Sequence, residues 1–140
     1  MKGILIMKMK KLNTIQKRNK LNDVFGIETD SVTYNHHHFY SIYLGGLKPD
    51  EKINEEDIFN IRFQTGPRNE PHSIPGVLDT DLLEIVRDRL KYFQTTEFSC
   101  RENACALTHI EEALMWLNKR VEDRAEKEIL GTNIADKEEE

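Results

Sequence analysis

The sequence predicts an α+β fold, in which a small antiparallel sheet or β-hairpin precedes an antiparallel pair of helices. From Asp79 to about Ile129, apolar residues recur at three- and four-residue steps, as on amphipathic helices. Two earlier runs are short and rich in β-branched and aromatic residues, which is typical of strands. The chain has 140 residues, of which 38% are hydrophobic and 32% charged, so we expect one small domain that completes its core by oligomerising.

The charge of the chain is distributed unevenly, although the net charge is −5. Every charged residue before Asp23 is basic, and the last five residues read DKEEE. We therefore expect residues 1–30 to be a basic, loosely ordered extension, residues 31–132 to form a single domain and residues 133–140 to be an acidic tail. A Lys-rich arm can also contact nucleic acid or anionic lipid, so the sequence leaves that alternative open.

The hydrophobic runs of the sequence predict neither a membrane-spanning segment nor a signal peptide. No run approaches the roughly 18 apolar residues that span a bilayer, and the opening MKGILIM is too short for a signal peptide. We expect a cytoplasmic protein that does not enter a membrane, in which Cys100 and Cys105 remain reduced.

The two predicted strands are Val32–Leu44 and Ile58–Gln64. The second alternates apolar and polar residues, as a half-buried strand does. The loop between them carries Gly45, Gly46 and Pro49. We expect the two runs to pair as an antiparallel hairpin with a long loop.

The helices have recognisable start signals. Asp79 and Thr80 are both good N-cap residues for the first helix. Ser99 followed by Glu102 three residues later is a capping-box pattern for the second helix. Gly131 is the expected C-terminal stop.

Catalytic and metal-binding motifs are missing from the sequence. His36 and His38 share one face of the predicted strand, but no nearby Cys or Asp cluster completes a zinc site. Cys100 and His109 lie nine residues apart on one predicted helix, about 13 Å, too far for a catalytic pair within one chain. The sequence therefore predicts a binding protein, not an enzyme, with no metal and no cofactor.

Three residues at the predicted helix–helix turn combine chemistry that suits a nucleotide. Phe93 offers a ring on which a base can stack, and Asn103 offers an amide that can read its polar edge. Arg101 lies in the first turn of the second helix, where free N–H groups favour an anion. The alternative is that Phe93 belongs to the core and Asn103 is an ordinary polar residue at a helix start.

Three further arginines are candidate phosphate contacts. Arg120 and Arg124 lie four residues apart on one helix face, and Arg68 lies in the loop TGPRNE. Arg120 lies 17 residues beyond Asn103, about 25 Å along a helix, so the two sets cannot line one small pocket in a single chain. The residues form separate sites, or an oligomer brings them together.

An ordered series of motifs resembles a known family. The segments FQTGPRNE, PGVLDTDLLEIVRDRLKYFQ and FSCRENACALTHIEEALMWLNKRVEDR, followed by ILGT, are similar to the phage Thoeris anti-defence proteins of the first described type. These proteins share a helical hairpin domain with phage anti-CBASS sponges. The resemblance covers about residues 63–132 and does not extend to the basic first thirty residues. The segment ILGT lacks the basic residue that usually precedes its Gly-Thr pair.

The resemblance implies a sponge, which binds and withholds a nucleotide second messenger without cleaving it. The implied ligand is a glycocyclic ADP-ribose isomer made during infection of a bacterial host, with cyclic trinucleotides of CBASS as a second class at a separate site. It also implies a homodimer, or a hexamer built as a trimer of dimers. The implied contacts to the cyclic ADP-ribose isomer are Phe93, Asn103 and Arg124, to which the residue pattern adds Arg101, and those to cyclic trinucleotide phosphates are Arg68 and Arg120.

Two competing functions remain at the level of sequence. One is an enzyme that degrades the same signal, against which stands the missing acid–base pair. The other is a small phage interaction or nucleic-acid-binding module that uses the Lys-rich arm. Nucleic acid is not an expected partner of the sponge, and salt-dependent DNA binding would favour the module.

Overall fold

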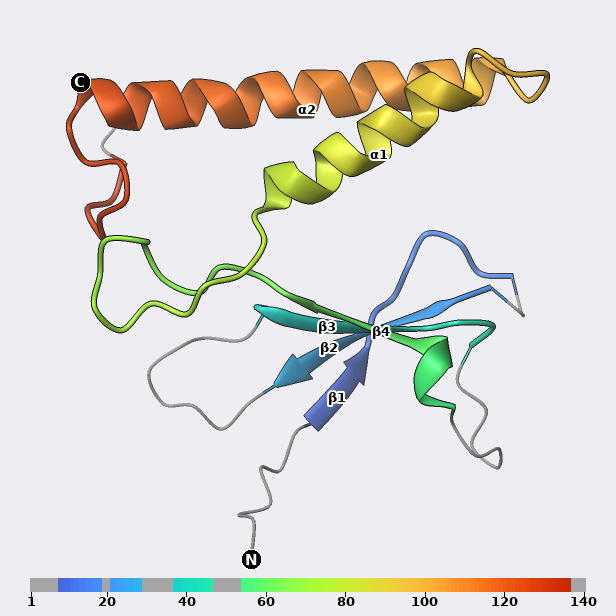
Figure 1. Cartoon of the computed structure of the whole chain (residues 1–140), viewed down its shortest axis with the longest axis horizontal. Helices are drawn as coiled ribbons and strands as arrows, with labels where there is room; N and C mark the ends of the chain where they lie inside the picture. The colour runs from blue at the N-terminus through green and yellow to red at the C-terminus, as the bar shows by residue number, and fades with distance from the viewer. Residues whose placement is uncertain (1–7, 19–20, 29–36, 47–53, 137–140) are drawn as a thin grey trace, which may run out of the picture. The chain divides into compact units, whose positions relative to one another are not determined.

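The computed structural model describes residues 8–18, 21–28, 37–46 and 54–136 (Figure 1). The chain forms two compact units, Met1–Thr65 and Gly66–Glu140, and each is described by itself. The first unit is a four-stranded sheet and the second is a helical hairpin with flanking loops. The α+β prediction is therefore confirmed. Neither helix in the described part of the chain is long and apolar enough to cross a membrane.

The sheet is an antiparallel meander in which each strand pairs with the next along the chain. Its order is β1-β2-β3-β4. The strand bounds are β1 Lys8–Lys11, β2 Asp23–Glu28, β3 Phe39–Tyr43 and β4 Ile58–Arg62. The predicted hairpin is confirmed in β3 and β4, where Tyr43 pairs with Ile58. The first predicted strand is shorter than expected, and its residues 32–36 lie outside the described part.

The prediction of a loosely ordered N-terminal extension is wrong for β1 and β2, which make half of the sheet. The segment KMKK has no apolar alternation, but an edge strand tolerates lysines because one side of it is not paired. Lys11 lies 3.1 Å from the Asp23 carboxylate on the neighbouring strand. Gly26 interrupts the apolar pattern of β2, and a Cβ there would touch the side chains of Leu12 and Tyr40.

One face of the sheet carries the packed side chains of the first unit. Phe25 and Tyr43 are buried and meet edge to face, with ring centroids 5.1 Å apart. The Ser41 hydroxyl is also buried and donates to Asn60 Oδ1 at 2.5 Å. This strand-to-strand hydrogen bond satisfies a polar group that would otherwise be costly to bury.

The second unit contains helix α1, Asp79–Phe93, and helix α2, Arg101–Glu126, which pack against each other. Leu78 is the N-cap of α1, and its backbone N–H donates to Asp81 Oδ2 at 2.8 Å. Thr80 is therefore not the cap, and Asp79 is already inside the helix. An ion pair ties the helices together, because Arg87 Nε donates to Glu111 Oε2 at 2.8 Å. The Glu111 carboxylate, with Glu84 next, raises the pKa of Arg87 above its ordinary value.

The predicted Ser99–Glu102 capping box is wrong, because α2 begins one residue later. Its N-cap is Cys100, whose Sγ accepts from the Asn103 backbone N–H at 3.4 Å. A thiol is a weak acceptor, so this cap contributes little. The Gln94 side chain compensates by bonding both backbone groups of Cys100, at 3.2 Å each.

The C-terminal end of α2 is a Schellman motif formed before Gly131. The Glu128 N–H donates to Ala125 O, and the Ile129 N–H donates to Arg124 O, both at 3.0 Å. Glu128 occupies the left-handed position with φ 59°. The prediction that Gly131 ends the helix is therefore wrong. Gly131, with φ 77°, serves a later turn, where a Cβ would lie 2.7 Å from Asn69 Nδ2.

Replacing Glu128 by glycine is expected to stabilise the second unit by about 1 kcal/mol, because glycine adopts a positive φ without the steric cost of a Cβ. The measurement is a thermal or denaturant unfolding curve. Glu126→Gly is the matched control, since this residue has helical geometry and its replacement should destabilise by a similar amount. Destabilisation by both substitutions would contradict the role assigned to Glu128.

The helical hairpin buries none of its apolar side chains fully in the single chain. Among the described residues, Arg124 is the one buried residue of the two helices. Met115, Trp116 and Phe98 are 69%, 66% and 67% exposed. Adjacent exposed apolar side chains, such as Met115 and Trp116 on α2, are typical of a surface that another molecule covers.

Candidate functional site

The tip of the hairpin places Phe93 and Asn103 at neighbouring helix ends. Phe93 is the last residue of α1 and Asn103 lies in the first turn of α2. Both are half-buried, and the Asn103 side-chain amide has no hydrogen-bond partner within the described residues. Because the Phe93 ring and this free amide lie at the same end of the hairpin, the tip is suited to a planar ligand with a polar edge.

Short hydrogen bonds hold the turn at the tip. The Thr96 hydroxyl donates to Phe93 O at 2.7 Å, and the Thr95 hydroxyl donates to Tyr92 O at 2.6 Å. These bonds satisfy the last carbonyls of α1. The turn at the tip is therefore held against the end of α1 by hydrogen bonds to Tyr92 and Phe93.

Positive charge lies close to the Phe93 ring. The guanidinium of Arg89 lies over this ring, with its carbon 5.5 Å from the ring centroid. Arg101 is exposed at the start of α2. In the part of the chain that the structure describes, neither arginine has an ion pair, so both charges remain available to an anion. The sequence prediction named Arg101 and missed Arg89, although its spacing of four residues from Phe93 was visible.

Arg124 has a different environment from the one that the sequence predicted. It is 6% exposed, and its guanidinium donates four hydrogen bonds to the C-terminal segment. The acceptors are Ile129 O, Thr132 O, Ile134 O and the Asp136 carboxylate, at 2.8–3.1 Å. In this conformation Arg124 shapes residues 129–136, because all four of these hydrogen bonds are made to that segment.

Arg120 shares one acceptor with Arg124. Its Nε donates to Asp136 Oδ2 at 2.8 Å, while Arg124 Nη1 donates to Oδ1 at 2.8 Å. Chiefly because Arg124 donates to the carboxylate, the pKa of Asp136 lies below its ordinary value of 3.8, with partial desolvation opposing and Arg120 adding to the shift.

The lowered pKa predicts how the attachment of Asp136 depends on pH. A carboxyl group whose pKa is lower in the folded state stabilises that state above its unfolded pKa, and the stabilisation is lost as the pH falls through the folded pKa. We therefore expect Asp136 to remain paired with the two arginines near neutral pH and to be released only below the ordinary Asp pKa of 3.8. The measurement is an NMR titration of the Asp136 carboxyl carbon. A midpoint at or above 3.8 would contradict the two arginine contacts.

A cavity of about 330 Å³ adjoins Arg120. Its lining comes from one face of α2 and from Asp136, and consists of Trp116, Lys119, Arg120, Asp123, Arg124, Lys127 and Asp136. The spacing of the α2 residues could have been recognised in the sequence as a helix face. Asp136 could not, because only the reversal of the chain after α2 brings it there.

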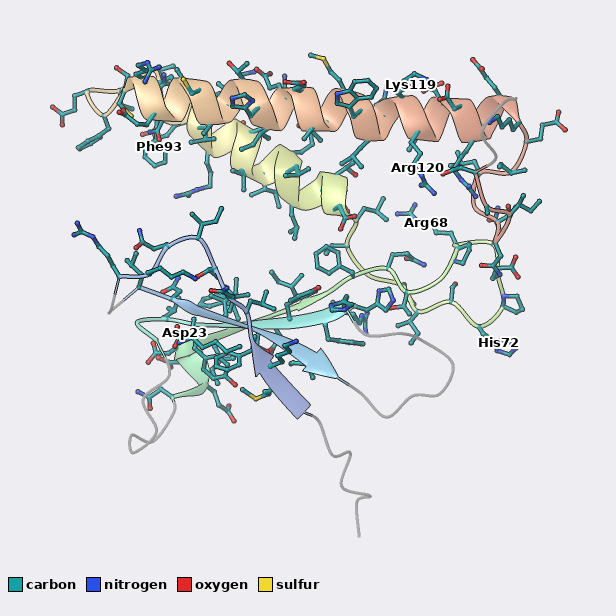
Figure 2. The ribbon with its side chains drawn as sticks, turned by 180° about the vertical axis from the view of Figure 1, so that it is seen from behind. Asp23, Arg68, His72, Phe93, Lys119 and Arg120 are labelled. Carbon is teal, nitrogen blue, oxygen red and sulfur yellow. The ribbon has the colours of Figure 1, made fainter. Side chains whose placement is uncertain are left out.

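Arg68 lies on the loop before α1, and its guanidinium is exposed. It has no ion pair among the residues that the structure describes. The adjacent residue, Asn69, lies against Gly131 in the C-terminal segment. Figure 2 shows Arg68 and Arg120 toward the same end of the second unit, whereas Phe93 lies at the other end. Arg124, which the sequence assigned with Phe93 to one ligand, donates to the same Asp136 carboxylate as Arg120 and so belongs to the Arg120 end.

A second cleft, of about 390 Å³, lies between the two helices. It combines the Arg87–Glu111 ion pair with apolar side chains that include Leu114 and Met115. No group of three or more His, Cys, Asp or Glu residues placed to hold a metal occurs in the described ranges. His36 of the predicted histidine pair lies outside those ranges.

Two comparisons with known proteins place the chain in a family. Residues 55–122 match the model of the Acb2/Tad1 hairpin domain. The chain is also similar to "Thoeris anti-defense 1" of Bacillus phage SBSphiJ7, with 39% identity over 126 residues, covering 79% of this chain and 88% of that protein. The matched domain contains the tip residues and Arg120. Residues 55–122 are therefore an Acb2/Tad1 hairpin domain, and the chain belongs to the Thoeris anti-defense 1 family.

Proposed function

We propose that this chain is a phage anti-defence protein that sequesters a cyclic ADP-ribose-type immune signal, a glycocyclic ADP-ribose isomer, without cleaving it. Membership in a family of Thoeris anti-defence proteins supports the anti-defence role. The single observation that supports the ligand is the hairpin tip, where Phe93 and the unpartnered Asn103 amide lie at adjoining helix ends.

The tip supplies each interaction that an adenine nucleotide needs. The base stacks on Phe93, and the amide of Asn103 can donate to and accept from its polar edge. Arg101 and Arg89 carry unpaired charges for the diphosphate. Stacking contributes about 1–3 kcal/mol per base. Nanomolar sequestration requires about 12 kcal/mol, so charge-assisted hydrogen bonds must supply much of the remainder.

The other end of the hairpin is suited to a second ligand class. Arg120 adjoins a cavity of about 330 Å³ that also contains the exposed ring of Trp116. Arg68 contributes a free guanidinium from the loop on the same side of the unit. A cyclic trinucleotide has three phosphates and three bases, which such a combination of arginines and an aromatic side chain can bind.

A second copy of the chain is the proposed cover for the exposed apolar side chains of the hairpin. An antiparallel dimer would bring the tip of one chain beside the Arg120 end of its partner, although Asn103 and Arg120 lie about 25 Å apart within one chain. Three such dimers would make a hexamer. The proposed location is the cytoplasm of the infected bacterial cell, where the signals are made.

The proposal is tested by isothermal titration of the full chain with cyclic ADP-ribose isomers and, separately, with a cyclic trinucleotide. Nanomolar binding of at least one isomer, with a fixed number of ligands per dimer, is the expected result. Binding to a random DNA duplex that weakens steeply with salt, without any nucleotide binding, would support the Lys-rich nucleic-acid module instead.

A further inference from the structure

A carboxylate of the chain itself occupies the arginine pair at the C-terminal end of α2. The Asp136 oxygens accept from Arg120 Nε and Arg124 Nη1, each at 2.8 Å. The carboxylate therefore carries one negative charge and uses two oxygens to bridge two guanidinium groups. A phosphodiester has the same charge and two free oxygens, so it can form the same bridge.

The two arginines depend on Asp136 to different extents. Arg124 retains three carbonyl acceptors when the carboxylate leaves, so its buried position does not require Asp136. Arg120 is 59% exposed, and Asp136 is its one ion-pair partner in the described part of the chain. Departure of the carboxylate therefore frees Arg120, while Arg124 stays in place as a rigid second donor.

The Asp136 carboxylate can leave the two arginines without disrupting any packed core. The Asp136 side chain is 48% exposed. Its ion pair with Arg120 is exposed on both sides, and such a pair is weak because water competes for both partners. The adjoining cavity of about 330 Å³ provides space for the group that replaces it.

We propose that Asp136 is a built-in competitor that a ligand phosphate must displace from Arg120 and Arg124. The proposal rests on the role of Arg120 as a phosphate contact. An anion with two suitably spaced oxygens recovers both lost hydrogen bonds, whereas an anion with a single acceptor recovers only one. Asp136 therefore lowers the affinity for every anion and disfavours small anions most.

The test compares the full-length wild type with Asp136→Asn and Asp123→Asn, using a cyclic trinucleotide and inorganic pyrophosphate as probes. Asp123→Asn is the matched control, because it removes the same charge from the same cavity but Asp123 pairs with Lys119, at 2.6 Å. Release of the exposed ion pair with Arg120, and of one of the four hydrogen bonds of Arg124, predicts about three- to tenfold tighter binding by Asp136→Asn. A clearly smaller gain in affinity is expected for Asp123→Asn. Adding Arg120→Gln to the Asp136→Asn variant should abolish the gain in affinity.

A second measurement follows the carboxylate directly. In the wild type, the NMR signal of the Asp136 carboxyl carbon should shift when the trinucleotide binds, because the group loses both arginines. Weaker binding by Asp136→Asn would show that Asp136 positions Arg120 and does not compete. Equal gains in affinity by Asp136→Asn and Asp123→Asn would contradict the proposal, because the loss of any one negative charge would then explain both.

The two levels of the proposal fail in different ways. A wild type that binds the trinucleotide, without a gain in Asp136→Asn and without a carboxyl shift, would overturn the competitor alone. No binding by the wild type or by Asp136→Asn would overturn the phosphate role of Arg120, and the competitor with it.

Discussion

Replacing Phe93 by alanine is expected to weaken binding of the cyclic ADP-ribose isomer by about 10- to 100-fold, which corresponds to the loss of one base–aromatic stack of about 1–3 kcal/mol. Asn103→Ala should weaken it by about tenfold or more, because the hydrogen bonds to the base edge are lost. The measurement is isothermal titration, with the unfolding temperature of each variant recorded in parallel.

Controls for this prediction separate stacking from packing. Phe93→Leu keeps an apolar side chain but removes the ring, so it should bind nearly as weakly as the alanine variant, whereas Phe93→Tyr should bind almost normally. Tyr92→Ala is the matched aromatic control, since that ring lies 5.6 Å from Phe93 and is largely exposed. If Phe93→Leu bound as tightly as the wild type, Phe93 would be a packing residue and the tip would not be the site.

Replacing Arg124 is expected to release the C-terminal segment. Arg124→Lys keeps the charge, but one ammonium cannot reach the four acceptors that the planar guanidinium spans. Because several carbonyls lose a buried donor, we expect a loss of about 2–4 kcal/mol in the local stability of residues 129–136. Amide hydrogen exchange of these residues measures the change.

Arg120→Lys serves as the comparison for Arg124. It removes one bond to the same Asp136 carboxylate from an exposed side chain, so the segment should remain protected from exchange. If Arg124→Lys preserved this protection and instead abolished binding of the cyclic ADP-ribose isomer, the predicted ligand role of Arg124 would be restored and the structural role rejected.

The helices could be predicted from the sequence, because their apolar residues repeat with the helical period over many turns. Their ends could not be placed as well. Cys100 is the cap of α2 although Ser99 has the stronger capping chemistry, because the Gln94 side chain holds the backbone of Cys100. Strands β1 and β2 were missed because a lysine-rich edge strand and a strand interrupted by Gly26 carry no local alternation, and their pairing is set by the register of the sheet.

The candidate site also has one part that could be predicted from the sequence and one part that could not. The positions of Phe93, Asn103 and Arg101 follow from the turn between two helices, which is a local feature of the sequence. The environment of Arg124 does not, because its acceptors lie up to twelve residues further along a chain that reverses direction. Helix periodicity placed Arg120 and Arg124 on one face, but it could not show that one is exposed and the other buried.

Sequestration without cleavage is tested most directly by recovering the ligand. A glycocyclic ADP-ribose isomer is mixed with increasing amounts of protein, the free ligand is separated by filtration, and the protein is then denatured by heat and the released ligand quantified by chromatography. We expect free ligand to fall in fixed proportion to the protein, and the full amount to return chemically intact. Cleaved product, or consumption of more ligand than there are binding sites, would contradict sequestration and show an enzyme.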